Sequence, residues 1–515
     1  MTFGKNRVQY NDFYWTYYRF KNFDTYFYVG GKEVAEYIGR YAQADIEEVE
    51  KIFDYRSNAR FQFIIYNKLS DLKQTNIGLE SAGEQSYNIG GITRIVVNKI
   101  LIYFNGDHAL LHQQIKSGVA QVLFDQLMYG GNIKERLQAS ILLNFPEWYV
   151  KGLTSYIGRG WTTADDNCMR DGILSGRFNK FNRLMDNDAV FAGHSMWRYI
   201  ADTYNKQSLS NLIYMTRINR SIESGFSYVL GVSLKELSVN WLNYYQKLYL
   251  NSDNGRTIIS EKPLSVKLKP NRILREVKVS PDGSMVAYVS NDIGKYRIHI
   301  FDVKSGKSTR IAKGGYKSIQ QENDLSVPLL AWHPSGRMLS YMNERKGKVW
   351  FSLYTTEDKK TETTQFLYFE KILSYAYSDN GQQLVLSGVQ KGQSDIFLYG
   401  IRSRQAKNVT ADLYDDLYPQ FVNGSSQIIF SSNRSNDTVG VEYRKNPMQN
   451  NLDLFLIDPE QRNIVTQRLT NTPNANEIYA SQIDSTHYTF LGDDNGIYNR
   501  YIVKLDSTIS FIDTT

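Results

Sequence analysis

The amino-acid sequence predicts two halves of different class, an α+β half followed by an all-β half. Two observations carry this prediction. Up to about residue 250 apolar residues recur with a helical period between short strand-like runs, whereas after about residue 270 they alternate along short strands. The second region also repeats a unit of roughly 43 to 60 residues. Because 515 residues are too many for one hydrophobic core, we predict parts at 1–105, 106–250, 251–269 (a linker) and 270–515.

Residues 1–105 mix strands with one long helix. The runs at 23–30 and 60–67 predict strands, and 92–106 predicts one or two more. Between the first two, residues 32–53 place Val34, Ile38, Tyr41, Ile46 and Val49 close to a 3.6-residue period. This part is therefore expected to be the strand–helix upper layer of the first half.

Residues 106–250 are expected to be almost wholly helical. The segment "HQQIKSGVAQVLFDQLMYGG" (112–131) predicts a long amphipathic helix, which pairs with a second helix in "FPEWYVKGLTSYIG" (145–158). Near the end of this part Ser233 is a predicted N-cap, with Glu236 as its capping-box partner three residues later. The polar run at 251–263 then predicts a linker and a domain boundary.

The repeat region predicts a β-propeller. Its first unit reads "REVKVSPDGSMVAYVSNDIGKYRIHIFDVKSGK", and matching turns are "AWHPSGRMLSYMN", "AYSDNGQQLVLSG", "QFVNGSSQIIFSSN" and a worn copy, "SQIDSTHYTFLGDD". The Asp-Gly, Ser-Gly and Asn-Gly pairs allow the positive φ that tight hairpins between alternating strands need. Each unit is expected to form one four-stranded blade.

The unit "SPDG…AYVSN…IHIFDV" resembles the repeats of TolB-type propellers, and the resemblance covers about 270–510. That family usually closes its ring with six blades, and five repeats are visible in this sequence. Two explanations stay open. Either the propeller continues beyond residue 515, or the linker contributes a closing blade.

Composition excludes several classes of protein. The 60 Lys and Arg and the 53 Asp and Glu residues are interspersed, so the net charge of +7 is not gathered into the basic block that nucleic-acid binding needs. The single cysteine, Cys168, excludes an internal disulfide and any cysteine-rich metal site. No apolar run is long enough to span a membrane. The 38 tyrosines fit β-structure or an adhesive surface.

The region from about 20 to 250 resembles the peptidase MA-like branch of the gluzincin metallopeptidases, whose zincin-like fold sets a strand layer above helices. Such enzymes take a third zinc ligand, Glu, from a helix that opens Pro-x-Trp-x-x-Glu-Gly-Leu. Pro146, Trp148, Gly152 and Leu153 match that pattern, but Lys151 stands at the ligand position. An ammonium group repels a metal ion instead of binding it.

The other zinc-binding motif of this family, HExxH, aligns best with "IKSGVAQVL". Ser117 and Gln121 then replace the two histidines, and Gly118 replaces the catalytic glutamate. Ser and Gln are poor zinc ligands, and the base that would polarise a metal-bound water is missing. The alignment therefore predicts a pseudoenzyme with no metal and no cofactor.

An alternative register must be weighed against this one. His108 and His112 lie four residues apart, which is also a metal-capable spacing on a helix, and Glu147 would be their acidic partner. The opposing interpretation places both histidines in the first turns of the helix with no metal. In either register the catalytic base is absent.

The resemblance implies a non-catalytic, protein-binding scaffold of the bacterial cell envelope, as in proteins of Bacteroidota that pair these two folds. Its location would be the periplasm or the outer membrane after removal of a signal peptide, and its partners would be envelope proteins held by the propeller rim and the pseudo-active cleft. The alternatives are an active zinc metallopeptidase with an atypical site and a glycan- or muropeptide-binding module. No nucleic-acid partner is expected.

Overall fold

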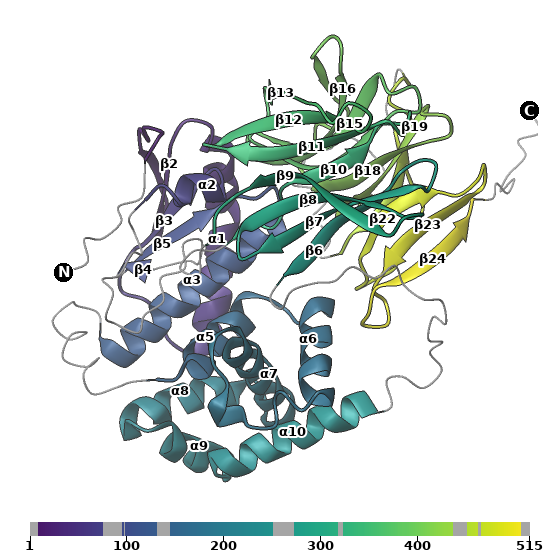
Figure 1. Cartoon of the computed structure of the whole chain (residues 1–515). Helices are drawn as coiled ribbons and strands as arrows, with labels where there is room; N and C mark the ends of the chain where they lie inside the picture. Colours follow the sequence, from purple (N-terminus) through teal and green to yellow (C-terminus); the bar gives the residue numbers. More distant parts are fainter. Residues whose placement is uncertain are drawn as a thin grey trace, which may run out of the picture.

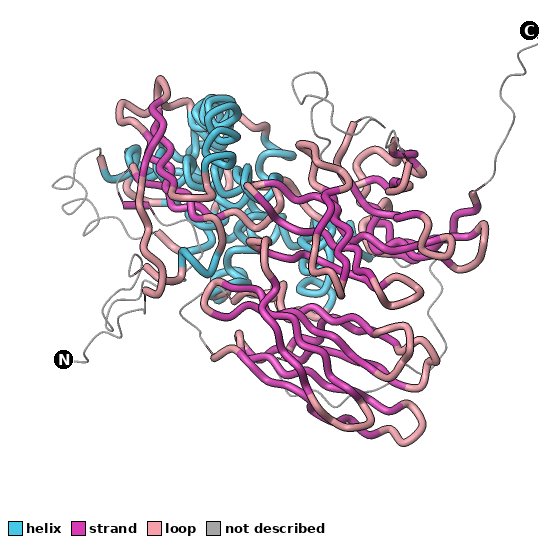
Figure 2. The backbone as a smooth tube through the Cα atoms, turned by 90° about the horizontal axis from the view of Figure 1, so that it is seen from above, coloured by secondary structure: helices cyan, strands magenta, loops and turns pink. Residues whose placement is uncertain are grey.

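The computed structural model describes residues 9–75, 95–96, 98–130, 145–250, 272–317, 323–435, 451–461 and 465–505. Within them a sheet with helices precedes an array of antiparallel sheets (Figure 1). Seen from above, the helices gather on one side and the sheets fan out from them (Figure 2). The α+β half and the all-β half that the sequence predicts are both confirmed at this level. The predicted linker and the boundary at 251–263 lie outside the described residues.

The first half is built on one mixed sheet in the order β1-β2-β3-β5-β4. Its three central strands are parallel, and the edge strands β1 and β4 run antiparallel to their neighbours. The predicted strands are all present, whereas β1 was not predicted. The bounds are β1 Thr16–Arg19, β2 Phe23–Phe27, β3 Phe61–Tyr66, β4 Ile95–Val96 and β5 Lys99–Tyr103.

Helices pack below this sheet around one large apolar core. The predicted helix at 32–53 is confirmed to the residue, because its apolar positions face the sheet and α3. Glu236 N donates to Ser233 Oγ at 3.1 Å, as the N-cap prediction requires. The bounds are α1 Lys32–Phe53, α2 Leu69–Leu72, α3 His108–Tyr129, α5 Glu147–Gly158, α6 Thr163–Leu174, η1 Phe181–Arg183, α7 Asp186–Tyr204, α8 Gln207–Asn219, α9 Ile222–Leu230 and α10 Leu234–Leu250.

The helix predicted at 112–131 exists as α3, but it is not amphipathic. Residues 118–120 and 122–124 are buried without interruption, so apolar side chains leave the helix in every direction. The reason is its position, since α3 contacts β5, α1 and α5 and has neighbours on most of its sides. A helix in such a place needs no polar face.

The second half consists of five antiparallel sheets in the described part of the chain, one for each predicted repeat. Blade 1 is β6 Ile273–Val279, β7 Met285–Asp292, β8 Lys295–Asp302 and β9 Lys307–Gly314; blade 2 is β10 Leu329–Trp332, β11 Met338–Arg345, β12 Lys348–Thr355 and β13 Thr361–Phe366; blade 3 is β14 Lys371–Tyr377, β15 Gln383–Gln390, β16 Gln393–Gly400 and β17 Ala406–Asn408; blade 4 is β18 Asp416–Val422, β19 Gln427–Ser432, β20 Asp453–Ile457 and β21 Thr466–Arg468; blade 5 is β22 Glu477–Gln482, β23 His487–Gly492 and β24 Asn499–Lys504.

The blades stack through their first strands, as a propeller requires. Contacts run from β6 to β10, β14, β18 and β22 in turn, and an apolar cluster fills each space between neighbours. The turns after the first strands of blades 1 to 4 carry Gly283, Gly336, Gly381 and Gly424, all with φ between 65° and 71°. Glycine takes such angles at little cost because it has no Cβ atom. The predicted β-propeller is therefore confirmed.

Candidate functional site

The helix α5 carries the residues that match the metallopeptidase pattern. Trp148, Gly152 and Leu153 are buried in the core of the first half. A Cβ atom added to Gly193 of α7 would lie 2.1 Å from the carbonyl oxygen of Trp148, and one added to Gly152 would lie 2.6 Å from the Gly193 backbone. The matching residues therefore let α5 and α7 cross in close contact, which is a packing role.

Lys151 lies on the same helix, at the position of the third zinc ligand in the resemblance. Its ammonium pairs with the carboxylate of Glu147, one turn earlier. Both side chains reach solvent, with exposed fractions of 43% for Lys151 and 37% for Glu147. This pairing is one of the two outcomes open to a lysine at that site, since an unpaired, buried ammonium would be costly.

We expect the substitution Lys151→Met to change the free energy of unfolding by less than about 0.5 kcal/mol, because exposed ion pairs four residues apart contribute little. Chemical denaturation of the two proteins at neutral pH measures the difference. A loss of several kcal/mol would contradict the exposed pair and would indicate a buried Glu147 left without its partner.

The positions aligned with HExxH lie on α3 and are half-buried, apart from the buried Gly118. Ser117 packs against α5 so closely that a Cβ atom on Gly158 would collide with its hydroxyl. Gln121 Nε2 donates to Asp125 Oδ1 at 2.9 Å along its own helix. These side chains therefore serve helix packing and local hydrogen bonding, while Lys151 pairs elsewhere.

The two histidines of the alternative register occupy the first turns of α3, where the sequence places them. Their Nδ1 atoms contact different carboxylates, His108 with Asp415 Oδ1 at 2.6 Å and His112 with Asp45 Oδ2 at 2.7 Å. Glu147, the third residue of that register, pairs with Lys151 on α5. The structure thus separates the three residues among other partners.

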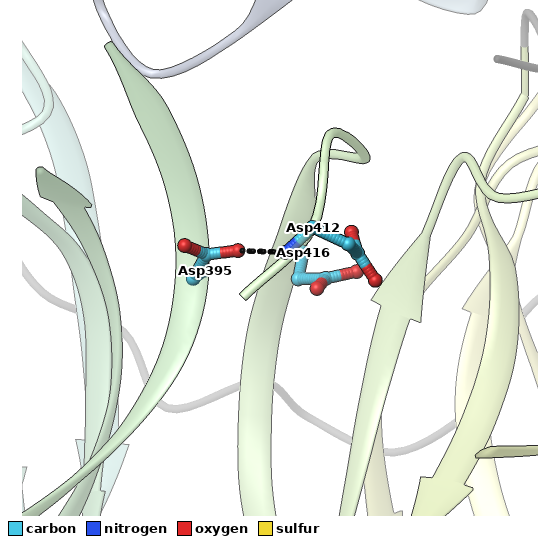
Figure 3. A group of neighbouring side chains, drawn as sticks. All are labelled: Asp395, Asp412 and Asp416. Carbon is cyan, nitrogen blue, oxygen red and sulfur yellow. Dashed lines mark hydrogen bonds between the residues drawn. The ribbon is translucent and has the colours of Figure 1, made fainter. Parts of the chain in front are cut away.

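A group of three aspartates that the sequence analysis did not identify lies in the propeller. Asp395 on β16, Asp412 before β18 and Asp416 at the start of β18 offer carboxylate oxygens within 4.8 Å of one another (Figure 3). All three are buried. In the part of the chain that the structure describes, this is the one set of three acidic, histidine or cysteine side chains with the spacing of a metal site.

The guanidinium of Arg434 already supplies a cation to this group. Its Nη2 donates to both oxygens of Asp416 at 2.7 and 2.8 Å, and its Nη1 lies 3.2 Å from Asp412 Oδ2. Asp395 accepts from Asn408 Nδ2 at 2.8 Å and from the backbone N–H of Asp412 at 3.3 Å. We therefore assign the aspartates to a buried ion-pair cluster that joins blades 3 and 4.

Burial also changes the titration of the cluster. It raises the pKa of Asp395 to about 7 and that of Asp412 to about 8, and the nearby Asp416 adds to both effects. Arg434 opposes the rise at Asp412. The two carboxyls therefore tend to keep a proton near neutral pH, while Asp416 holds the arginine through two hydrogen bonds.

A serine–histidine contact in the helical layer has a structural explanation as well. Ser155 Oγ lies 2.9 Å from His194 Nδ1, and His194 is buried. Burial, with the nearby Arg159, lowers the pKa of His194 to about 4, so the ring is neutral at pH 7. It packs against the rings of Tyr156 and Trp161 as a hydrogen-bonded core residue.

None of the described helices combines the length and the apolar character that crossing a membrane requires. This finding agrees with the sequence, in which no apolar run reaches that length.

The protein-family models and the curated proteins compared with this chain contain no match to it. Solved structures match the chain in part. TolB from Acinetobacter baumannii is 12% identical with a TM-score of 0.31, over 46% of this chain and 55% of TolB. The β-propeller domain of the trilobed protease from Pyrococcus furiosus is 12% identical with a TM-score of 0.31, over 47% of this chain and 83% of that domain.

A third match is prolyl oligopeptidase B from Galerina marginata, 11% identical with a TM-score of 0.30, over 45% of this chain and 35% of that enzyme. The chain thus aligns with only about half of the length of TolB. Similarities this distant carry no statement about activity, and the propeller is established by its own strand order.

Proposed function

We propose that the protein is a non-catalytic, protein-binding scaffold of the bacterial cell envelope, built on a pseudo-metallopeptidase half and a TolB-like propeller. The observation that carries the proposal is the pairing of Lys151 with Glu147 on α5. By the resemblance, this helix would present the third zinc ligand. It presents instead an ion pair that engages Glu147, the acidic residue of the alternative register.

The topology of the first half supports the metallopeptidase resemblance. The family sets a strand layer above helices, and here a mixed sheet with an antiparallel edge strand, β4, covers α1 and α3. On this proposal the fold is kept for its shape. Trp148 and Leu153 of the matching pattern are core residues, whereas Ser117, Gln121 and Lys151 stand where the family has its zinc ligands.

Protein binding is supported by an aromatic edge on the same sheet. The strand β1 is an edge strand, and the chain that forms and precedes it exposes Tyr14 (78%), Tyr17 (48%) and Trp15 (39%). Exposed aromatic side chains are the residues that most often anchor protein interfaces. An edge strand also offers backbone groups to an added strand.

The test combines metal analysis with affinity purification from envelope fractions. We expect less than about 0.1 zinc per chain in the purified protein, no chelator-sensitive peptide cleavage, and a defined envelope protein that co-purifies stoichiometrically. The double substitution Tyr14→Ala with Tyr17→Ala should reduce that co-purification at least about tenfold. Tyr228→Ala is the matched control, because Tyr228 is 75% exposed and lies on α9, a different element of the first half.

Three results would contradict the proposal. One zinc per chain, lost in His108→Ala with His112→Ala, would indicate the alternative metallopeptidase. Retention of a polysaccharide or muropeptide in place of a protein would indicate a glycan-binding module. A protein that elutes alone from native extracts would contradict the scaffold itself.

A further inference from the structure

The two halves of the protein are in direct contact. Val389 of β15 belongs to the apolar core of the first half, and Leu373 of β14 packs against that core. Polar contacts accompany these apolar ones. Lys68 Nζ donates to Gly347 O at 2.5 Å, and Nζ of Lys371, the first residue of β14, donates to Asn105 Oδ1 at 3.3 Å. We call this contact region the seam. Any polar group that is buried in the seam needs a hydrogen-bond partner there.

The deepest contact of the seam lies at the corner between β5 and α3. Asp415 of the propeller accepts four hydrogen bonds there, two from each half. Its Oδ1 faces His108 Nδ1 at 2.6 Å and Ser394 Oγ at 3.0 Å, and its Oδ2 faces His108 N at 2.9 Å and Asn433 Nδ2 at 3.2 Å. The side chains of His108 and Asp415 are 2% and 3% exposed.

The backbone contact of Asp415 is made to the first residue of a helix. His108 begins α3, and its N–H has no partner within the helix. A carboxylate at this end also interacts favourably with the positive end of the helix dipole. Gly106, two residues earlier, has φ of +87° and lies so close to Val389 that a Cβ atom would be 2.6 Å from its Cγ2. The chain between β5 and α3 therefore packs closely against the propeller.

The next blade repeats this arrangement. Asp416 pairs with Ser432 in blade 4 as Glu477 pairs with Gly492 in blade 5, so Asp415 corresponds to Asn476 and Asn433 to Asp493. Asn476 and Asp493 are hydrogen-bonded to each other like their counterparts, with Asn476 N donating to Asp493 Oδ1 at 2.5 Å.

In this second pair the aspartate also binds the start of a helix. Thr163 is the first residue of α6, and its Oγ1 donates to Asp493 Oδ2 at 2.8 Å. Two successive blades therefore use one Asp–Asn pair each, and the aspartate of each pair reaches the first residue of a helix in the other half.

We propose that Asp415 and Asp493 form a two-point clamp, through which the propeller holds the first turns of α3 and α6 and couples them to its own blades. The clamp does not depend on the proposed binding function. The helix α3 begins at His108, which Asp415 contacts, and it also carries the aligned positions Ser117 and Gln121. We therefore expect a change at blade 4 to reach this helix through its first turn.

Hydrogen exchange on the full chain tests the clamp. We expect Asp415→Asn to speed amide exchange at least about tenfold both in residues 108–112 and in 413–416. The NH2 group of the new asparagine would face groups that donate hydrogen bonds to the carboxylate, so those hydrogen bonds would be lost. His108→Asn should give the same two-sided pattern and is the milder variant if Asp415→Asn does not fold. Thr163→Val should speed exchange both at the start of α6 and around Asn476 and Asp493, and should leave residues 108–112 unchanged.

The propeller offers a matched control in Asp484 and His487, an aspartate–histidine pair at 2.9 Å with 54% and 39% exposure and no part in the seam. Asp484→Asn should leave exchange in 108–112 unchanged. The clamp is overturned if a folded Asp415→Asn protein exchanges faster only in the propeller, or if the increase spreads evenly over the whole chain. Neither result bears on metal content or co-purification, so the clamp and the binding function fail separately.

Discussion

Arg434→Met should lower the free energy of unfolding of the propeller by about 3–5 kcal/mol, because it leaves the buried Asp416 without the donor that holds both of its oxygens. Arg434 has no exposed surface, and neither does the side chain of its partner Asp416. Its guanidinium also lies over the rings of Tyr414, Phe430 and Phe455 at 5.4 to 5.5 Å. Because Met has a similar volume, the lost free energy of unfolding reflects the missing positive charge more than lost packing. Denaturant titration followed by circular dichroism measures it.

The control for this prediction is Arg337→Met. Arg337 is 73% exposed and faces the exposed Glu357 at 3.7 Å, so its loss should cost less than about 0.5 kcal/mol. Arg434→Met combined with Asp416→Leu should recover much of the stability, since removing a whole buried pair costs less than removing one partner. A cost below about 1 kcal/mol for Arg434→Met alone would mean that Asp416 is solvated or finds another donor.

The local structure of both halves could be predicted from the sequence. The period of apolar residues identifies α1 exactly, and the glycine turns identify the hairpins of the first four blades. These signals are local, since each depends on residues a few positions apart. Where burial comes from distant neighbours the prediction is wrong, as for α3, whose buried faces reflect contacts with β5, α1 and α5.

The candidate site divides in the same way. Lys151 and Glu147 are four residues apart, so their pairing could be predicted from helix geometry. The contact between His108 and Asp415 joins residues 307 positions apart, and no pattern around either residue indicates the other. Only the fold brings them together.

The aspartate cluster was missed for a related reason. Asp412, Asp415 and Asp416 lie within five residues of one another in the sequence, but they separate in the structure. Asp415 faces the seam, whereas Asp412 and Asp416 face Arg434. Asp395 joins from a different strand of the preceding blade. A charge run of this kind is usually solvated, and recognising a buried one requires the register between blades.

The titration of this cluster makes the stability of the propeller depend on pH near neutrality. We expect the free energy of unfolding to fall by about 2 kcal/mol between pH 6.5 and pH 8. Asp395 and Asp412 have pKa values of about 7 and about 8 in the folded protein, against an ordinary value of 3.8. The folded state therefore binds more protons than the unfolded state in this range. Such a contribution is fully present below the unfolded pKa and is lost as the pH rises through the folded one.

Between pH 6.5 and pH 8 the loss of stability from Asp395 and Asp412 is larger than an opposing gain from His194. His194, with a pKa lowered to about 4, adds stability as the pH rises toward its ordinary value of 6.5, and most of that gain is complete at the start of the range.

Urea titrations at intervals of half a pH unit give the slope of the unfolding free energy against pH. Asp412→Asn mimics the neutral acid and should remove the largest single share of the slope. Its carboxyl has a higher pKa than that of Asp395 and than that of Glu370, whose pKa burial also raises to about 7. Asp282→Asn is the control, since Asp282 lies in an exposed turn with a pKa of about 2 and does not titrate in this range. A stability that stays constant or rises from pH 6.5 to pH 8 in the unaltered protein would contradict the retained protons, and an unchanged slope in Asp412→Asn would locate them elsewhere.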